Sequence, residues 1–428
     1  MISVLNTVLH LTLIIGIAWW ICRRLPIADH TFWPALVLKL GAGIALGLLY
    51  TFYYPVADTF AYFNDGSKLA EIARESFASY LRLLFMNDGA DGLDLAMLEP
   101  RALFLTKVTS ILSLLTFDNY WAISLYYSGI SFLAAWYLVT VIHRFIRCAS
   151  SAAVVAFLFM PSVVFWTSGL LKESLAMAAF FFLSAVFLKI WFHKPIGWWQ
   201  ILLAMLGLWV FWNLKYYYAG VFAAVAVTTL IFRAVIPARI NQSAGIQAVV
   251  WLAILSMPVV AVSFLHPNFN LDRISAVIVS NNQAYNVLSD AGEYVRFESL
   301  TEEPLDLLLN APLALFSGLF RPFIWETSSL PQLLQGVENA MLLMLFVAAM
   351  FTCGKYARSP HRLLILSAVA FIVLTAVFIT MSSPNFGTLS RYRVGYISFF
   401  AFIVLCENPL LSYLQRYVPR LSRLDRKS

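Results

Sequence analysis

The chain has 428 residues, of which 61% are hydrophobic, 16% are aromatic and 12% are charged. Soluble domains carry about 45–50% apolar and about 25% charged residues, so this composition excludes a water-soluble globular protein and indicates a polytopic membrane protein. The net charge of +7 does not indicate nucleic-acid binding, because no run interleaves Lys and Arg with aromatic residues. The four cysteines are isolated, without a CxxC pair, and do not indicate a metal or redox site.

The first apolar stretch, residues 3–22, lacks a basic leading region and a small-residue cleavage site before Arg23. We therefore expect a retained span rather than a cleaved signal. Apolar stretches of sufficient length predict an all-α polytopic protein with about eleven transmembrane helices. Their expected ranges are 3–22, 32–53, 121–142, 152–166, 174–192, 198–213, 219–236, 246–264, 335–353, 363–380 and 394–412.

Basic residues gather in alternate short loops and in the C-terminal tail, which the positive-inside rule assigns to the cytoplasm. They are Arg23, Arg24, Arg144, Arg147, Lys189, Lys194, Arg233, Arg239, Lys355, Arg358, Arg362, Arg416, Arg420, Arg423, Arg426 and Lys427. These residues share one side only if the apolar stretches 103–117 and 304–324 do not cross. We expect both to be in-plane or re-entrant helices on the outer side, with the N-terminus outside and the C-terminus inside.

The absence of a linker or repeat predicts one integral membrane domain over residues 1–428, with two long outer segments at 54–120 and 265–334. The first segment is acidic, as a translocated loop can be. Its apolar residues recur at helical spacing between 69 and 84, which predicts an amphipathic helix of about five turns along the membrane surface.

Two carboxylates at the expected outer ends of spans are candidate catalytic groups, because ionisable residues at a membrane edge are often functional. Asp58 follows the second span and could cap the next helix or act as a general base. Asp65 is a weaker candidate, because Asp65-Gly66 is also typical of a turn. Glu173 opens the fifth span, where the helix dipole favours a carboxylate. Breaks in the preceding segment would let Lys172 and Glu173 line a polar pocket.

Several outer cations run against the positive-inside bias and lie beside aromatic residues and broken helices. The cations are Lys215, Arg321, Arg391 and Arg393, and their aromatic neighbours include Tyr216, Tyr392 and Trp325. Each cation alone could be an interfacial anchor, and Glu326 and Glu338 could pair with them structurally. Together they predict a site for a phosphate, which Arg binds bidentately and Lys binds as a point charge. At a membrane edge, that phosphate is most naturally a lipid phosphate.

The order of these residues resembles the N-terminal module of GT-C glycosyltransferases, such as the protein mannosyltransferases and the lipid A aminoarabinose transferases. The matching residues are the first outer carboxylate Asp58 with Tyr62, then Pro161, then the second carboxylate Glu173. The late tripeptide Arg391-Tyr392-Arg393 is similar to an RYR motif near the last spans of many bacterial relatives. The segments 320–326 and 385–393 also resemble those of uncharacterised bacterial membrane proteins encoded with surface-polysaccharide genes.

The resemblance covers residues 32–192 and the late tripeptide, and the chain departs from the family in three ways. It has an extra span at 3–22, it has Asp58-Thr59 where the family usually has an acidic pair, and it has no large soluble C-terminal domain. The resemblance implies a bacterial inner-membrane enzyme whose active site faces the periplasm or exterior. It would move a sugar from a polyprenyl-phosphate carrier to a glycan, lipid or protein acceptor, in surface polysaccharide or glycoconjugate assembly.

In this interpretation Asp58 deprotonates the acceptor, and the cations bind the leaving lipid phosphate together with Lys172, Tyr62, Tyr216, Trp325 and Glu326. No cofactor is indicated, and the use of a divalent metal is left open, because carboxylates are present without a recognisable ligand spacing. One alternative is an O-antigen-type polysaccharide polymerase centred on Arg321, Arg391 and Arg393. Another is a flippase or transporter of lipid-linked saccharides, for which only Lys39 is a plausible mid-span charge.

Overall fold

The computed structural model describes residues 2–23, 29–53, 58–86, 92–146, 148–236, 243–265, 270–290, 292–417 and 424–425. Across these ranges all named elements are helical, which confirms the expected all-α class. They are α1 (Ile2–Cys22), α2 (Asp29–Phe52), α3 (Asp58–Glu75), α4 (Phe77–Met86), α5 (Pro100–Thr116), α6 (Tyr120–Phe145), α7 (Ser150–Val154), η2 (Val155–Phe159), α8 (Pro161–Trp166), α9 (Lys172–Trp191), α10 (Trp198–Val235), α11 (Ala244–Leu265), α12 (Leu271–Leu288), α13 (Pro304–Phe320), η5 (Ile324–Glu326), α14 (Leu330–Met350), α15 (Cys353–Arg358), α16 (Arg362–Ser382), α17 (Phe386–Tyr392), α18 (Val394–Leu405) and α19 (Pro409–Tyr417). Among the predicted cytoplasmic residues, Arg24, Arg147, Arg239, Arg420, Arg423, Arg426 and Lys427 lie outside the described ranges.

Seven of the described helices are long and apolar enough to cross a membrane, which supports a multi-pass membrane protein. They are Ser3–Cys22, His30–Phe52, Tyr120–Phe145, Lys172–Trp191, Trp198–Val235, Leu330–Met350 and Arg362–Ser382. The pair α18 and α19, bent by 76°, would be an eighth span. The expected count of about eleven is not confirmed.

The difference in count arises where expected spans are merged or broken. The stretches 198–213 and 219–236 form one element, α10, in which Lys215 alone has non-helical backbone angles (φ −144°, ψ 60°). A straight helix of that length would measure about 57 Å, nearly twice the roughly 30 Å of a hydrocarbon core. The stretch 152–166 is divided into α7, the π-helical turn η2 and α8, with Pro161 at the first position of α8.

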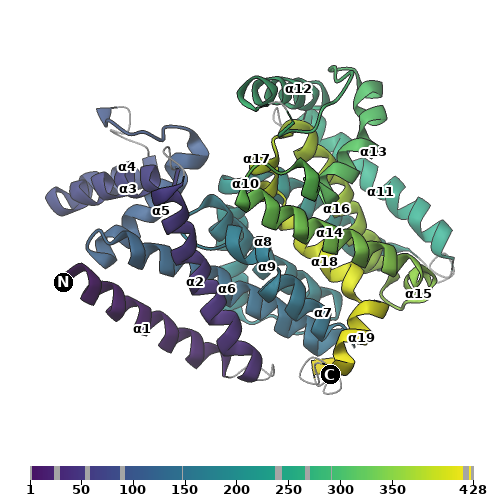
Figure 1. Cartoon of the computed structure of the whole chain (residues 1–428), viewed down its shortest axis with the longest axis horizontal. Helices are drawn as coiled ribbons and strands as arrows, with labels where there is room; N and C mark the ends of the chain where they lie inside the picture. The colour runs from purple at the N-terminus through teal and green to yellow at the C-terminus, as the bar shows by residue number, and fades with distance from the viewer. Residues whose placement is uncertain are drawn as a thin grey trace. The chain divides into compact units, whose positions relative to one another are not determined.

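The described residues form two compact units, and each is considered by itself. Unit 1 comprises residues 1–145 and 157–216, and unit 2 comprises residues 146–156 and 217–428. In unit 1, α6 packs against α1, α2, α5 and α9, and α3 packs against α4 and α5 (Figure 1). This arrangement places the N-terminal ends of α3, α5 and α9 within the same unit.

The expected amphipathic helix over 69–84 is instead two helices, α3 and α4, separated at Ser76. The Ser76 Oγ accepts the Ser79 N–H at 3.3 Å, as an N-cap does for a new helix. Leu69, Tyr80 and Leu83 are buried together, with Leu93 and Leu114 packed against them. The prediction of one continuous helix was therefore wrong, and part of its apolar face packs on protein.

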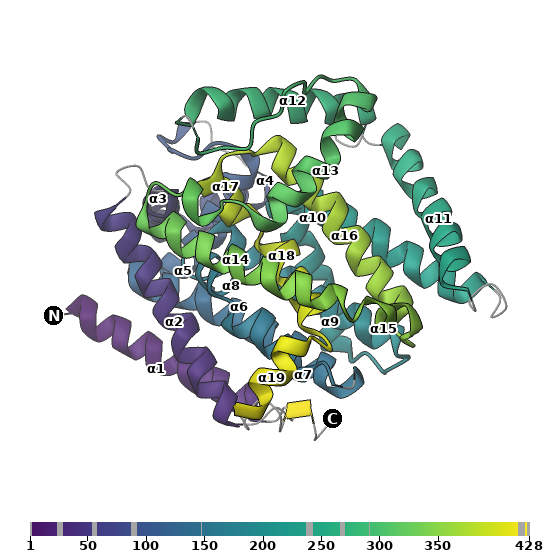
Figure 2. The same cartoon turned by 45° about the vertical axis from the view of Figure 1, so that its right-hand side comes forward.

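In unit 2, α16 packs against α12, α13 and α18, and α14 packs against α18 (Figure 2). Ile278, Ala314 and Met381 form a buried cluster between α12, α13 and α16. A backbone hydrogen bond from Val295 N–H to Pro384 C=O (3.0 Å) ties the segment after α12 to the start of α17. The stretch 304–324, expected as an in-plane or re-entrant helix, consists of α13 and a short turn that leads into η5.

Candidate functional site

The candidate site of unit 1 is built on a buried ion pair between α9 and α10. Glu173 lies in the first turn of α9, and its Oε1 is 2.8 Å from the Nζ of Lys215. Both side chains are almost fully buried, with 1% and 5% exposure. Removing one partner of such a pair leaves an uncompensated buried charge, so each ion holds the other in place. Lys215, the residue that contacts α9, is also the residue of α10 with non-helical backbone angles.

A second contact links the start of α9 to the start of α3. The Lys172 Nζ lies 5.4 Å from the centroid of the Tyr62 ring, within the range of a cation–π interaction. Tyr62 is buried in α3, one helical turn after Asp58, so the two residues lie on one face of that helix. Asp58 is partly exposed in the first turn of α3. The structure thereby places the first turn of α9, which carries Glu173, against α3 one helical turn after Asp58.

Arg101 is a member of this neighbourhood that the sequence interpretation missed. It lies in the first turn of α5, and its guanidinium carbon is 5.7 Å from the ring centroid of Tyr216, the residue after Lys215. Its side chain is exposed, and no described carboxylate lies within ion-pair distance of it. The available signal was weak, because an isolated Arg in an acidic segment is normally a solvated residue.

Asp65 has a structural role. It is buried in α3, and its carboxylate accepts the backbone N–H groups of Ala96 (3.2 Å) and Met97 (2.9 Å). The turn expected at Asp65-Gly66 is wrong, since both residues are helical. Gly66 lets α3 approach α5 closely, because a Cβ there would lie 2.8 Å from the Thr109 Cγ2.

Unit 2 contains a separate cluster built on Arg321. The Arg321 Nε donates to the Glu326 Oε2 at 3.0 Å, and a terminal nitrogen donates to Oε1, so the pair is bidentate. Glu326 also accepts the Phe323 N–H at 2.9 Å, which fixes the turn that follows α13. The predicted structural pairing of Glu326 with a cation is confirmed. The Arg321 guanidinium also lies 5.1 Å from the Phe386 ring centroid.

Arg393 is fully buried within unit 2 and also contacts the turn that follows α13. It donates to the Arg321 C=O at 3.1 Å and to the Asn339 Oδ1. Asn339 in turn donates to the Pro322 C=O at 2.8 Å. The Arg393 Nε has no hydrogen-bond partner among the described residues. The fork of this arginine is therefore directed at protein groups.

The remaining predicted residues of unit 2 are Trp325, Arg391 and Tyr392. Trp325 is 80% exposed and stacks on Phe323, with ring centroids 4.8 Å apart. Arg391 is partly exposed in the last turn of α17. The carbonyl of the following residue, Tyr392, accepts a hydrogen bond from the Tyr218 hydroxyl at 3.0 Å.

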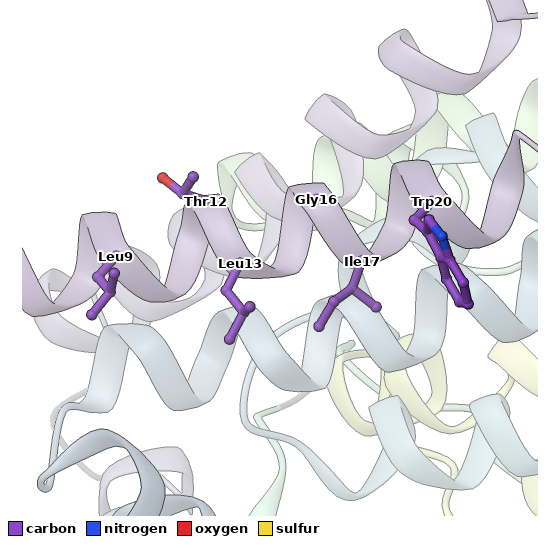
Figure 3. A pocket seen from close by; sticks show the side chains of 6 residues that line it. All are labelled: Leu9, Thr12, Leu13, Gly16, Ile17 and Trp20. Carbon is purple, nitrogen blue, oxygen red and sulfur yellow. The ribbon is translucent and has the colours of Figure 1, made fainter.

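A surface hollow lies elsewhere, along one side of α1 (Figure 3). Its lining is apolar apart from one threonine and comes entirely from α1: Leu9, Thr12, Leu13, Gly16, Ile17 and Trp20. It contains none of the predicted site residues. In the described part of the chain, no group of three or more His, Cys, Asp or Glu side chains is arranged to hold a metal ion.

Comparison of the chain with protein-family models, with curated proteins and with solved structures gives no significant match.

Proposed function

We propose that the protein is a membrane glycosyltransferase that moves a sugar from a polyprenyl-phosphate carrier to an acceptor on the outer face of the membrane. The observation that carries the proposal is the Lys172–Tyr62 contact, which joins the first turn of α9, bearing Glu173, to α3 one helical turn after Asp58. A transferase needs a base near the acceptor and cations near the leaving phosphate. Unit 1 offers both kinds of group at neighbouring helix starts.

Asp58 is the proposed general base. Its position in a first turn favours the carboxylate through the helix dipole, and its partial exposure leaves it accessible to an acceptor hydroxyl or amine. No other acidic residue lies in the first turns of α3 or α5, and Glu173 in the first turn of α9 is paired with Lys215. We therefore assign Glu173 a charge-balancing role in place of the catalytic role that the sequence suggested.

Lys172 and Arg101 are the proposed partners of the lipid phosphate. Each lies against the face of a tyrosine ring. A ring face attracts a cation without neutralising its charge, and no described carboxylate lies within ion-pair distance of Arg101, so Arg101 keeps its positive potential for an anionic ligand. Lys215 differs, because its charge is balanced by Glu173.

The reaction follows from these assignments. Asp58 accepts the proton of the acceptor O–H or N–H while the acceptor atom attacks the anomeric carbon of the donor. The bond from that carbon to the phosphate oxygen breaks, and its electron pair leaves with the polyprenyl phosphate. Lys172 and Arg101 stabilise the charge that develops on this oxygen. A single displacement of this kind inverts the anomeric configuration.

The test uses the full-length protein in liposomes with polyprenyl phosphates that each carry one hexose or amino sugar. Release of polyprenyl phosphate is measured by mass spectrometry, with a mixture of glycans and lipids as acceptors. Asp58→Asn should reduce release by at least about 100-fold, the usual contribution of a general base. Glu71→Gln, an exposed carboxylate on the same helix, is the matched control and should leave release unchanged. Equal activity of both variants would contradict the proposal.

The second candidate is a polysaccharide polymerase, favoured by the clustering of Arg321 and Arg393 with the adjacent Arg391 in unit 2. In that case Asp58→Asn should be tolerated. Replacing Arg321 or Arg391 with Lys should weaken polymerisation of a lipid-pyrophosphate oligosaccharide, because the planar fork is lost.

A further inference from the structure

Lys39 is an ionisable residue in the interior of α2 that the proposed chemistry does not use. It is buried, and no described carboxylate lies within ion-pair distance of its Nζ. The Nζ instead donates to the Thr167 Oγ1 and to the Val164 C=O at 3.4 Å. Thr167 donates its own hydroxyl proton to the Val163 C=O at 2.6 Å, so its oxygen has a lone pair for Lys39. A buried Lys in a span is costly, and this one is directed at the end of α8.

The turn between α8 and α9 makes further polar contacts, which involve both α2 and α6. The Gly169 N–H donates to the Ser128 Oγ of α6 at 2.9 Å. The Ser168 Oγ lies 3.2 Å from the Lys39 C=O, although its shorter hydrogen bond, at 2.6 Å, goes to the Val164 C=O. Gly169 has φ +68°, and a Cβ there would lie 2.8 Å from Leu46 Cδ2.

The close packing of the turn against α2 depends on a small residue in α2. A Cβ at Gly43 would lie 2.3 Å from the Ser128 Oγ and 3.3 Å from the Gly169 nitrogen. Lys39, Gly43 and Leu46 are spaced by four and three residues, so one face of α2 supports the whole turn.

The turn leads directly into the charged residues of the candidate site. Ser174 closes it by donating its hydroxyl proton to the Gly169 C=O at 2.7 Å. Lys172 and Glu173 lie between these two bonded residues, so their positions follow from that of the turn. The depth of the turn follows from its neighbours Gly43 and Ser128. At 1.5 Å per residue, Gly43 is about 14 Å from the Phe52 end of α2, and Ser128 is about 12 Å from the Tyr120 end of α6. The start of α9 is thus recessed from both helix ends.

We propose that Lys39 is a positioning residue: it anchors the recessed turn 167–171 to α2 and thereby sets Lys172 on Tyr62 and Glu173 on Lys215. The anchoring role stands on the contacts of the turn alone. Its effect on catalysis rests on the proposed function.

The test is hydrogen–deuterium exchange of the full-length protein in lipid nanodiscs. Lys39→Met should raise the exchange rate of amides 167–173 by about tenfold or more, while amides in the middle of α6 keep wild-type rates. Lys39→Arg, which keeps a donor of similar reach, should restore most of the protection. Unchanged exchange in 167–173, or an equal rise throughout the protein, would overturn the proposal.

A second variant addresses misfolding of Lys39→Met. Thr167→Val keeps the lysine and removes its hydroxyl acceptor, and it should raise exchange at the same amides. Because the two side chains act through one contact, the double variant should exchange little faster than the stronger single variant. Additive effects of the two substitutions would contradict a shared contact.

The transferase assay then separates this inference from the proposed function. Lys39→Met should lower kcat more than it raises KM, because a displaced Lys172 stabilises the leaving phosphate less. If the exchange results are as expected but neither the wild type nor any variant shows transfer, the anchoring role of Lys39 stands and the proposed function fails. If transfer depends on Asp58 while Lys39→Met leaves exchange and kcat unchanged, the anchor fails alone.

Discussion

The two units hold similar sets of charged and aromatic residues but use their cations differently. In unit 2, Arg321 is bound bidentately by Glu326, and the buried Arg393 donates to a carbonyl and an amide. In unit 1, Lys172 and Arg101 lie against tyrosine rings, Lys215 is paired with Glu173, and no described carboxylate lies within ion-pair distance of Arg101. A cation beside a broken helix is therefore not by itself a ligand site. What matters is whether its charge and donors are already committed to protein groups.

The largest expected effect concerns the buried pair of unit 1. Glu173→Gln or Lys215→Met alone should destabilise the protein by about 3–5 kcal/mol, because the remaining partner becomes an unpaired buried charge. The double variant should recover much of the loss. Thermal unfolding in detergent of the wild type, the two single variants and the double variant gives the coupling energy between Glu173 and Lys215. Similar stability of the single variants and the wild type would show that the pair does not hold α9 to α10.

The next effect concerns Arg393 in unit 2. Arg393→Met should destabilise the protein by about 2–4 kcal/mol, because the Arg321 carbonyl and the Asn339 amide oxygen lose a charged donor. Arg393→Lys should recover only part of this, since a single ammonium group cannot reproduce the fork. Unfolding temperatures test the series, with the exposed Arg296→Gln as a control for loss of charge. A stable Arg393→Met variant would mean that the fork is not structural.

A smaller effect is expected at Arg101. Arg101→Gln should reduce transfer by roughly tenfold, since the residue is exposed and one of two cations proposed for the phosphate. Stability should stay near that of the wild type, because an exposed contact of this kind contributes about 1 kcal/mol or less. The loss should shrink at high salt, where surface charges are screened. If the Arg101→Gln variant transfers sugar at the wild-type rate, Arg101 does not bind the phosphate.

Much of this arrangement was predictable from the sequence, because apolar runs set most helices and polar runs mark their ends. The polar stretch around Lys215 predicted a break at the position where α10 bends. The pairing of Lys215 with Glu173 was not predictable, since it depends on how α9 and α10 pack. Arg101 was missed for the same reason: its partner, Tyr216, is distant in sequence. The merged helix α10 also shows that a single non-helical residue can separate two apolar runs without a loop.

The central claim is that the chemistry resides in unit 1. The most direct measurement is a single-turnover assay of polyprenyl-phosphate release by Asp58→Asn and Arg321→Lys, each normalised to folded protein. We expect a loss of at least about 100-fold for Asp58→Asn and near wild-type release for Arg321→Lys, whose guanidinium is already bound by Glu326. Near wild-type release by Asp58→Asn, with a large loss in Arg321→Lys, would contradict the account and place the chemistry at the arginine cluster of unit 2.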